Sequence, residues 1–188
     1  MLIRPAKAED ARAIASFIAM AESEMVHHFT GTSDPEKSIP ALTEFVLNPT
    51  PNRYSLENNT VAELDGKTAG AMISFPADKQ PDLDTVLLAA LNKRGYNLEK
   101  LFFEGEPGTY YLSTMGVDPT YRGRGIGTAL MQAAERKGAE LGFANCSLLV
   151  SKAKDRARAL YERIGYSVTE EVAIGDVEYY RMLKPLRK

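Results

Sequence analysis

The chain has 188 residues, of which 44% are hydrophobic and 26% are charged, and its formal net charge is -2 at pH 7. This length suits a single domain of roughly 100–200 residues, and the composition excludes a disordered chain. Because basic residues do not outnumber acidic ones, and because the chain has one cysteine and two histidines, we expect neither a nucleic-acid partner nor a metal site.

In chain order, the first residues predict a strand and then an amphipathic helix, since apolar residues recur at helical spacing from Ala11 to Ala21. Residues 22–60 are polar and predict a mostly irregular segment, within which helix-start signals at Asp34-Pro35 and Pro40 and apolar residues between 39 and 46 allow a short helix. A hairpin follows, because Asp65-Gly66 suits a two-residue turn that needs positive φ. The elements predicted up to this point are a strand at 2–4, a helix at 9–21, and hairpin strands at 61–64 and 68–75.

Residues 76–108 form a long excursion with one helical stripe between Leu83 and Leu91. The segment is too short to enclose a core of its own, so we interpret it as an insertion packed on the main domain. The sequence therefore predicts one domain over residues 1–188, with 22–60 and 76–108 as elaborations.

The second half predicts a strand–helix–strand–helix unit that is closed by another hairpin. The expected elements are strands at 109–117 and 144–150, helices at 125–141 and 155–163, and hairpin strands at 167–174 and 177–183. Together with the first half, this order predicts an α/β fold with a mixed sheet and a βαβ unit in its middle.

Three alternate glycines, Gly123, Gly125 and Gly127, stand where a predicted strand gives way to a predicted helix. Amides at a helix N-terminus have no intrahelical partner, and the helix dipole adds partial positive charge. Glycines also lack the Cβ atoms that would keep a phosphate away, and Arg122 and Arg124 add positive charge. The pattern therefore favours an anion cradle suited to a pyrophosphate.

Other phosphate-binding loops fit less well. The chain has no Gly-x-x-x-x-Gly-Lys-Ser/Thr run. A dinucleotide-binding loop needs a third glycine where Thr128 stands, and an acidic residue near 145–147, where there is none. The glycines alone would also fit a plain tight turn into a helix.

The segment Arg122-Gly123-Arg124-Gly125-Ile126-Gly127 resembles the Gln/Arg-x-x-Gly-x-Gly/Ala motif of the GNAT acetyltransferases. Residues 115–119 resemble the strand and turn before that motif, and 157–166 resemble the family's A-x-x-L-Y-E-x-x-G-F helix. The resemblance is strong over 109–166 and fainter over the first helix and the first hairpin. It implies a mixed, mostly antiparallel central sheet flanked by helices, with a βαβ acyl-CoA-binding core.

The resemblance implies that an acetyl group moves from acetyl-CoA to a primary amine by direct attack, with no metal. In the family, loop amides bind the pyrophosphate and a strand amide holds the acyl oxygen, where Gly116 would permit a bulge. Many members carry an asparagine seven residues before the helix tyrosine. This chain has Lys154 there, which donates hydrogen bonds but accepts none, so Ser151 is an alternative contact for the pantetheine arm. The residues expected to bind acetyl-CoA are Met115, Gly116, Val117, Arg122, Gly123, Arg124, Gly125, Ile126, Gly127, Thr128 and Lys154.

Two residues are candidates for proton transfer. Tyr161 matches the family position that protonates the leaving thiolate, and a tyrosine keeps its proton because its pKa lies above that of a thiol. Glu104 and Glu106 stand just before the central strand, and Glu106 is the first candidate for the base that deprotonates the amine. Four further residues follow the first helix, in a region that borders the acceptor site in the family: Glu22, Glu24, His27 and His28.

We therefore predict an N-acetyltransferase that acts on a small-molecule amine, because extra helices suit an enclosed acceptor. If Tyr54, Tyr110 and Tyr111 line that site, the acceptor carries an apolar or cationic part. The alternatives are a non-catalytic acyl-CoA-binding sensor, a protein N-terminal or lysine acetyltransferase, and a nucleotide-binding oxidoreductase, which the missing third glycine and acid disfavour. A homodimer is compatible with the sequence. The lack of a long apolar stretch predicts a cytoplasmic protein with no membrane partner.

Overall fold

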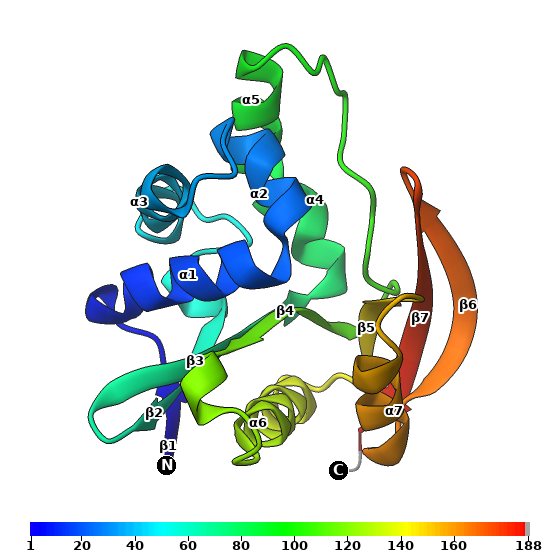
Figure 1. The fold of residues 1–188 in the computed structure, drawn as a ribbon. Coiled ribbons are helices and arrows are strands. Elements are labelled where there is room, and N and C mark those ends of the chain that lie inside the picture. The colour runs from blue at the N-terminus through cyan, green and yellow to red at the C-terminus, as the bar shows by residue number, and fades with distance from the viewer. Residues whose placement is uncertain (187–188) are drawn as a thin grey trace.

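The computed structural model describes residues 1–186, with the side chains of Ser23 and Glu24 outside that description. Its strands form one sheet in the order β1-β2-β3-β4-β5-β7-β6, and every neighbouring pair is antiparallel except β4 and β5 (Figure 1). The predicted mixed, mostly antiparallel sheet is therefore confirmed. The strands are β1 (Leu2–Pro5), β2 (Asn59–Leu64), β3 (Lys67–Pro76), β4 (Tyr110–Val117), β5 (Asn145–Ser151), β6 (Ser167–Ile174) and β7 (Val177–Pro185).

Helices cover both faces of the sheet. One face packs α1 against β3 and β4, with Ile14, Phe17 and Ile18 buried, and the opposite face packs α6 against the same strands. Figure 1 shows α2 to α5 gathered beyond α1, and α7 beside β5 and β7. No helix within residues 1–186 combines the length and the apolar character that crossing a bilayer requires. The helices are α1 (Ala11–Ala21), α2 (Ser23–Thr30), α3 (Pro35–Val46), α4 (Gln80–Leu83), α5 (Thr85–Lys93), α6 (Ile126–Glu140) and α7 (Asp155–Arg163).

Residues 22–60 are more regular than the sequence predicts. The backbone of Glu22 (φ -123°, ψ 36°) breaks the chain between α1 and α2, and α2 ends at Gly31, whose φ is +74°. Asp34 caps α3 by accepting a hydrogen bond from the N–H of Glu36 at 3.0 Å. The short helix that the sequence allows is confirmed as α3, whereas α2 was not predicted. Neither glycine nor proline marks the break before α2, so the sequence pattern carries no boundary signal there.

The parallel strands β4 and β5 pair through only two residue pairs, Tyr110 with Cys146 and Tyr111 with Ser147. Both strands continue well beyond these pairs. Their facing edges are therefore open toward their C-terminal ends, and the backbone groups along that opening lack a strand partner.

A bulge lies in β4 close to this opening. The register with β3 shifts by one residue between Ile73 and Ser74, which leaves Ser113 as the extra residue. The prediction of a bulge at Gly116 was therefore wrong, since Gly116 pairs regularly with β3. Its missing side chain instead lets α1 approach, because a Cβ at this position would lie 2.5 Å from the Cβ of Phe17.

Candidate active site

The glycine loop runs from the turn after β4 into the first turn of α6. Asp118 opens it by accepting a hydrogen bond from the N–H of Thr120 at 2.8 Å. Gly123 and Gly125 have φ of +76° and +77°, a left-handed conformation that favours glycine. No backbone N–H from residue 123 to 128 donates to another residue of the described chain. These amides lie at the positive end of the α6 dipole and are free to bind an anion.

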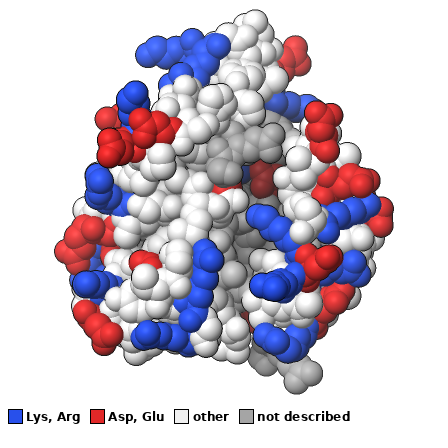
Figure 2. All heavy atoms as spheres, in the orientation of Figure 1, with Lys and Arg blue, Asp and Glu red and all other residues white. Residues whose placement is uncertain are grey.

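The space in front of this loop is open. A Cβ built at Gly123 or at Gly125 would meet no atom of another described residue within 4 Å, apart from the neighbours in the chain. Arg122 and Arg124 are exposed beside it, and Nη2 of Arg122 reaches α1, 3.1 Å from the Sδ of Met20. Figure 2 shows basic side chains on both sides of a hollow that descends this face of the molecule.

The end of β4 presents backbone donors to the opening. Asp118 donates its N–H to the carbonyl of Ala69 on β3 at 3.0 Å. Successive N–H groups of a strand point to opposite edges, so those of Val117 and Met115 point toward the side of β5, while that of Gly116 points to β3. The rest of the predicted motif forms the first turn of α6: Ile126, which is buried, and Gly127 and Thr128, which are half-buried.

Tyr161 lies on α7, and its ring packs edge-on against Tyr166 with 6.3 Å between the ring centroids. Its hydroxyl makes no hydrogen bond to any residue between 1 and 186. Burial raises the pKa of Tyr161 above its usual value, because a charged phenolate is poorly solvated there. The hydroxyl therefore stays protonated at neutral pH and has a donor to offer.

Lys154 is the N-cap residue of α7, and its exposed side chain forms no ion pair with a described residue. Its backbone N–H donates to the carbonyl of Ser151 at 2.9 Å, which closes the turn after β5. The Oγ of Ser151 accepts a hydrogen bond from the N–H of Ala153 at 3.3 Å. The ammonium of Lys154 is thus available to an external anion.

Glu106 precedes β4, with its side chain 39% exposed. Its carboxylate lies 3.3 Å from Nη1 of Arg181 on β7, and its backbone N–H donates to the hydroxyl of Ser147 on β5 at 3.2 Å. The structure thus places Glu106 beside β5, with its charge already paired to β7.

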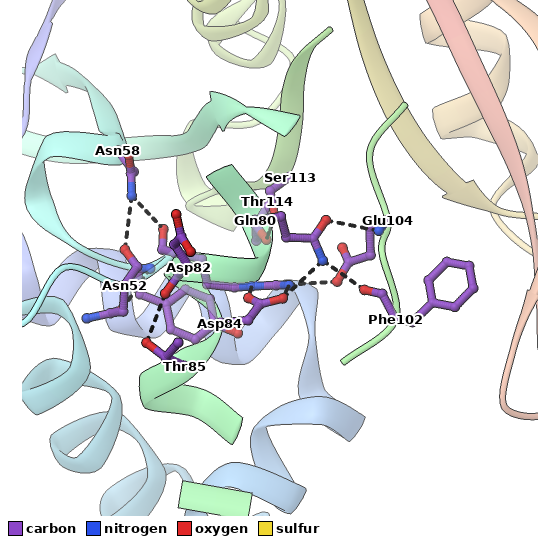
Figure 3. Close-up of polar contacts among 12 residues, drawn as sticks. Asn52, Asn58, Gln80, Asp82, Asp84, Thr85, Phe102, Glu104, Ser113 and Thr114 are labelled. Atoms are coloured by element: carbon purple, nitrogen blue, oxygen red, sulfur yellow. Dashed lines mark hydrogen bonds and ion pairs between the residues drawn. The ribbon is translucent and has the colours of Figure 1, made fainter. Parts of the chain in front are cut away.

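A buried polar network that the sequence analysis did not find joins both elaborations. Nε and Nη2 of Arg53 pair with the two carboxylate oxygens of Asp84 at 2.6 and 2.8 Å, and Nη1 pairs with Glu104 at 2.7 Å. Gln80 donates to Asp84 at 3.0 Å and accepts from the N–H of Glu104 at 2.9 Å (Figure 3). Arg53 is 31 residues from Asp84 and 51 from Glu104 in the chain, so only the fold brings them together.

Glu22, between α1 and α2, connects this network to β4. One carboxylate oxygen accepts a hydrogen bond from Tyr54 at 2.7 Å, and the other accepts one from the hydroxyl of Thr114, next to the bulge. Burial raises the pKa of Glu22, while the hydrogen bonds from Thr114 and Tyr54 and the charge of Arg53 act in the opposite direction. The net shift is upward, so the carboxyl titrates closer to neutral pH than an ordinary glutamate.

The two histidines lie further along α2. Nδ1 of His28 is 2.6 Å from the hydroxyl of Tyr96, and Nδ1 of His27 is 3.3 Å from the Oγ of Ser33. Both line a cavity of about 640 Å³ bordered by α1, α2 and α3. The side chain of Glu24, which the sequence analysis grouped with them, lies outside the described residues.

The condition under which Tyr54, Tyr110 and Tyr111 would line the acceptor site is not met. Their exposed fractions are 0%, 0% and 1%, so their rings belong to the core. Two of their hydroxyls form hydrogen bonds to buried carboxylates: Tyr54 donates to Glu22, and Tyr111 donates to Glu104 at 2.8 Å. Two of the three rings therefore support the buried network.

Comparison with known proteins places this geometry in a family. The model of the acetyltransferase (GNAT) family matches residues 22–166. A solved structure described as an acetyltransferase is 30% identical, with a TM-score of 0.78 over 100% of both chains. An N-acetyltransferase from Staphylococcus aureus Mu50 is 21% identical, with a TM-score of 0.84 over 97% of this chain and 100% of that one. A structure of the NatC complex bound to Gag peptide and CoA shares the fold, with 17% identity and a TM-score of 0.56 over 99% of this chain and 98% of that one.

Proposed function

Since the chain belongs to the GNAT acetyltransferase family, we propose that it transfers the acetyl group of acetyl-CoA to the primary amine of a small molecule. The observation that carries the proposal is the pairing of two features at one place. The free amides of residues 123–128 form an anion cradle, and the opening between β4 and β5 begins beside it. An acyl donor with a pyrophosphate and a narrow arm suits this combination.

Acetyl-CoA supplies a thioester, and the chain supplies the groups that hold and polarise it. The amides from Gly123 to Thr128 bind the pyrophosphate, with Arg122, Arg124 and Lys154 adding charge. The N–H groups of Met115 and Val117 point into the opening and serve as donors to the acyl oxygen.

Tyr161 protonates the leaving sulfur. Its hydroxyl has no competing acceptor among residues 1–186, and its raised pKa keeps the proton in place until a thiolate forms nearby. The Tyr161→Phe variant removes the hydroxyl and keeps the ring, so it separates donor binding from turnover.

A small acceptor is favoured by the helices around the site. The segments that carry α2 to α5 gather on the α1 side of the sheet (Figure 1). An acceptor that has to enter between these helices is more easily a small molecule than a folded protein.

Calorimetric titration with acetyl-CoA, with NADH as the control ligand, tests the donor. Binding of acetyl-CoA alone supports the proposal, whereas no binding or a preference for NADH refutes it. Release of CoA is then measured with a panel of small amines and with short peptides that have free N-termini. Turnover with small amines supports the proposed acceptor class. Turnover with peptides alone assigns a protein acceptor, and binding without any turnover assigns a sensor.

A further inference from the structure

We infer that Glu22 is the base that takes the proton from the acceptor ammonium, and that Thr114 and Tyr54 position its carboxylate. The inference rests on the proposed acetyl transfer and adds a residue to it. It arises from the buried network, whose one direct hydrogen bond to the C-terminal half of β4, within residues 1–186, joins Thr114 to Glu22.

The location of Glu22 suits a base. Thr114 follows the bulge on the part of β4 that has lost its pairing with β5, which is the part that presents donors to the acyl oxygen. The carboxylate of Glu22 is therefore one side chain away from the strand on which the acetyl group is proposed to lie. Two hydroxyl donors on two different elements fix both carboxylate oxygens, so the group cannot swing away.

The charges around Glu22 also suit an arriving cation. The titratable and charged groups that face it are Arg53 and Glu104 from the network and the hydroxyls of Tyr54 and Tyr111. Arg53 is the one cation among them, and its hydrogen bonds are directed to Asp84 and Glu104. The second carboxylate beside Glu22 raises the proton affinity of the pair, which favours acceptance of a proton from an ammonium ion.

The proton balance is complete with groups already named. Glu22 takes one proton from the ammonium, and the freed nitrogen lone pair forms the C–N bond while the C–S bond breaks. Tyr161 gives its proton to the sulfur and regains one from the nitrogen, directly or through water. The amide keeps the third proton, and Glu22 releases its own to solvent before the next cycle.

Glu106, the base predicted from the sequence, is the competing residue. Its carboxylate is paired with Arg181 on the far side of β5, whereas that of Glu22 is bound only by neutral hydroxyls. If Glu22 is the base, the pH-dependent loss of activity appears in Glu22→Gln, and if Glu106 is the base, it appears in Glu106→Gln. One experiment therefore compares the two residues.

The experiment measures kcat/KM between pH 6 and 10 by CoA release, with propylamine and with the best acceptor from the screen. Without a base, only the unprotonated amine reacts, and its fraction rises tenfold for each pH unit below the pKa of the amine. We expect Glu22→Gln to be about 100-fold slower than wild type at pH 7 and to recover about tenfold per pH unit above it. Glu63→Gln, an ion-paired carboxylate on β2, is the matched control.

A constant ratio of Glu22→Gln to wild type at every pH would mean a structural effect and would overturn the inference. The same holds if the pH-dependent deficit appears in Glu106→Gln and not in Glu22→Gln. Carbon NMR of glutamate labelled at the carboxyl carbon, in the acetyl-CoA complex, needs no acceptor. A Glu22 signal that stays protonated up to pH 9 refutes the assignment, and one that ionises below that supports it. Failure of acetyl-CoA to bind refutes the proposed function itself, which is a separate result.

Discussion

Replacing Gly116 by alanine tests how closely α1 is seated on β4. The new Cβ would lie 2.5 Å from the Cβ and 3.0 Å from the Cα of Phe17, and carbon atoms in contact are about 3.5–4.0 Å apart. These atoms are fixed to the backbone of α1, so no rotamer change relieves the clash and the helix has to shift by about 1 Å. Overpacking of this kind costs about 1–3 kcal/mol. For a chain of this size that lowers the Tm by roughly 2–12 °C.

The assay is thermal and urea unfolding of Gly116→Ala beside Gly127→Ala. A Cβ at Gly127 would meet the Cε of Met115 at 3.4 Å, an ordinary contact, and alanine favours a helix by up to about 1 kcal/mol. We therefore expect Gly127→Ala to match or exceed wild-type stability while Gly116→Ala falls. Because Gly116 lies between the two proposed oxyanion donors, Gly116→Ala should also lose turnover. Equal stability of Gly116→Ala and wild type would refute the reasoning about the α1 contact.

Three further predictions concern the site. Tyr161→Phe should bind acetyl-CoA normally and turn over at least about tenfold more slowly, and unchanged turnover would remove Tyr161 from the mechanism. CoA release can be followed with a thiol reagent, because the protein's own Cys146 is fully buried and its pKa is raised to about 12. Gly125→Val should weaken acetyl-CoA binding by calorimetry, whereas Gly142→Val, which meets a similar positive φ at the other end of α6, should not; equal losses would point to backbone strain alone. Burial raises the pKa of Glu22, so the folded state holds a proton that the unfolded chain releases, and stability should fall as pH rises from the ordinary glutamate range through the raised value. Urea unfolding across that range should show a flatter profile for Glu22→Gln, and an unchanged slope would contradict the shift.

The second half of the chain could be predicted closely because its signals are local. The glycine loop, the helix after it and the closing hairpin depend on turn residues and on apolar spacing, which short stretches of sequence contain. The close approach at Gly116 could not be predicted in this way. A glycine in a strand can mark either a bulge or the close approach of another segment. Here the approaching residue is Phe17, 99 residues earlier in the chain.

The buried network shows the same limit for the site. Arg53, Asp84 and Glu104 look like ordinary surface charges in the sequence, and only the packing of both elaborations on the sheet encloses them. Glu106 was a natural choice for the base because it stands near the central strand in sequence. Distance along the chain, however, does not tell on which side of β5 a carboxylate comes to lie, and here it faces Arg181.

The short pairing between β4 and β5 leaves a weakly paired junction between two parts of the sheet. On one side lie β1 to β4 and on the other lie β5, β7 and β6. The polar contacts between the two sides include two strand residue pairs, the 2.6 Å contact between the hydroxyls of Thr109 and Ser147, and the Glu106–Arg181 ion pair. A donor arm bound in the opening would contact both β4 and β5 and so connect the two parts of the sheet. The junction between β4 and β5 would then be most rigid with the donor bound and least rigid after CoA leaves. Its rigidity would therefore rise and fall once in each turnover.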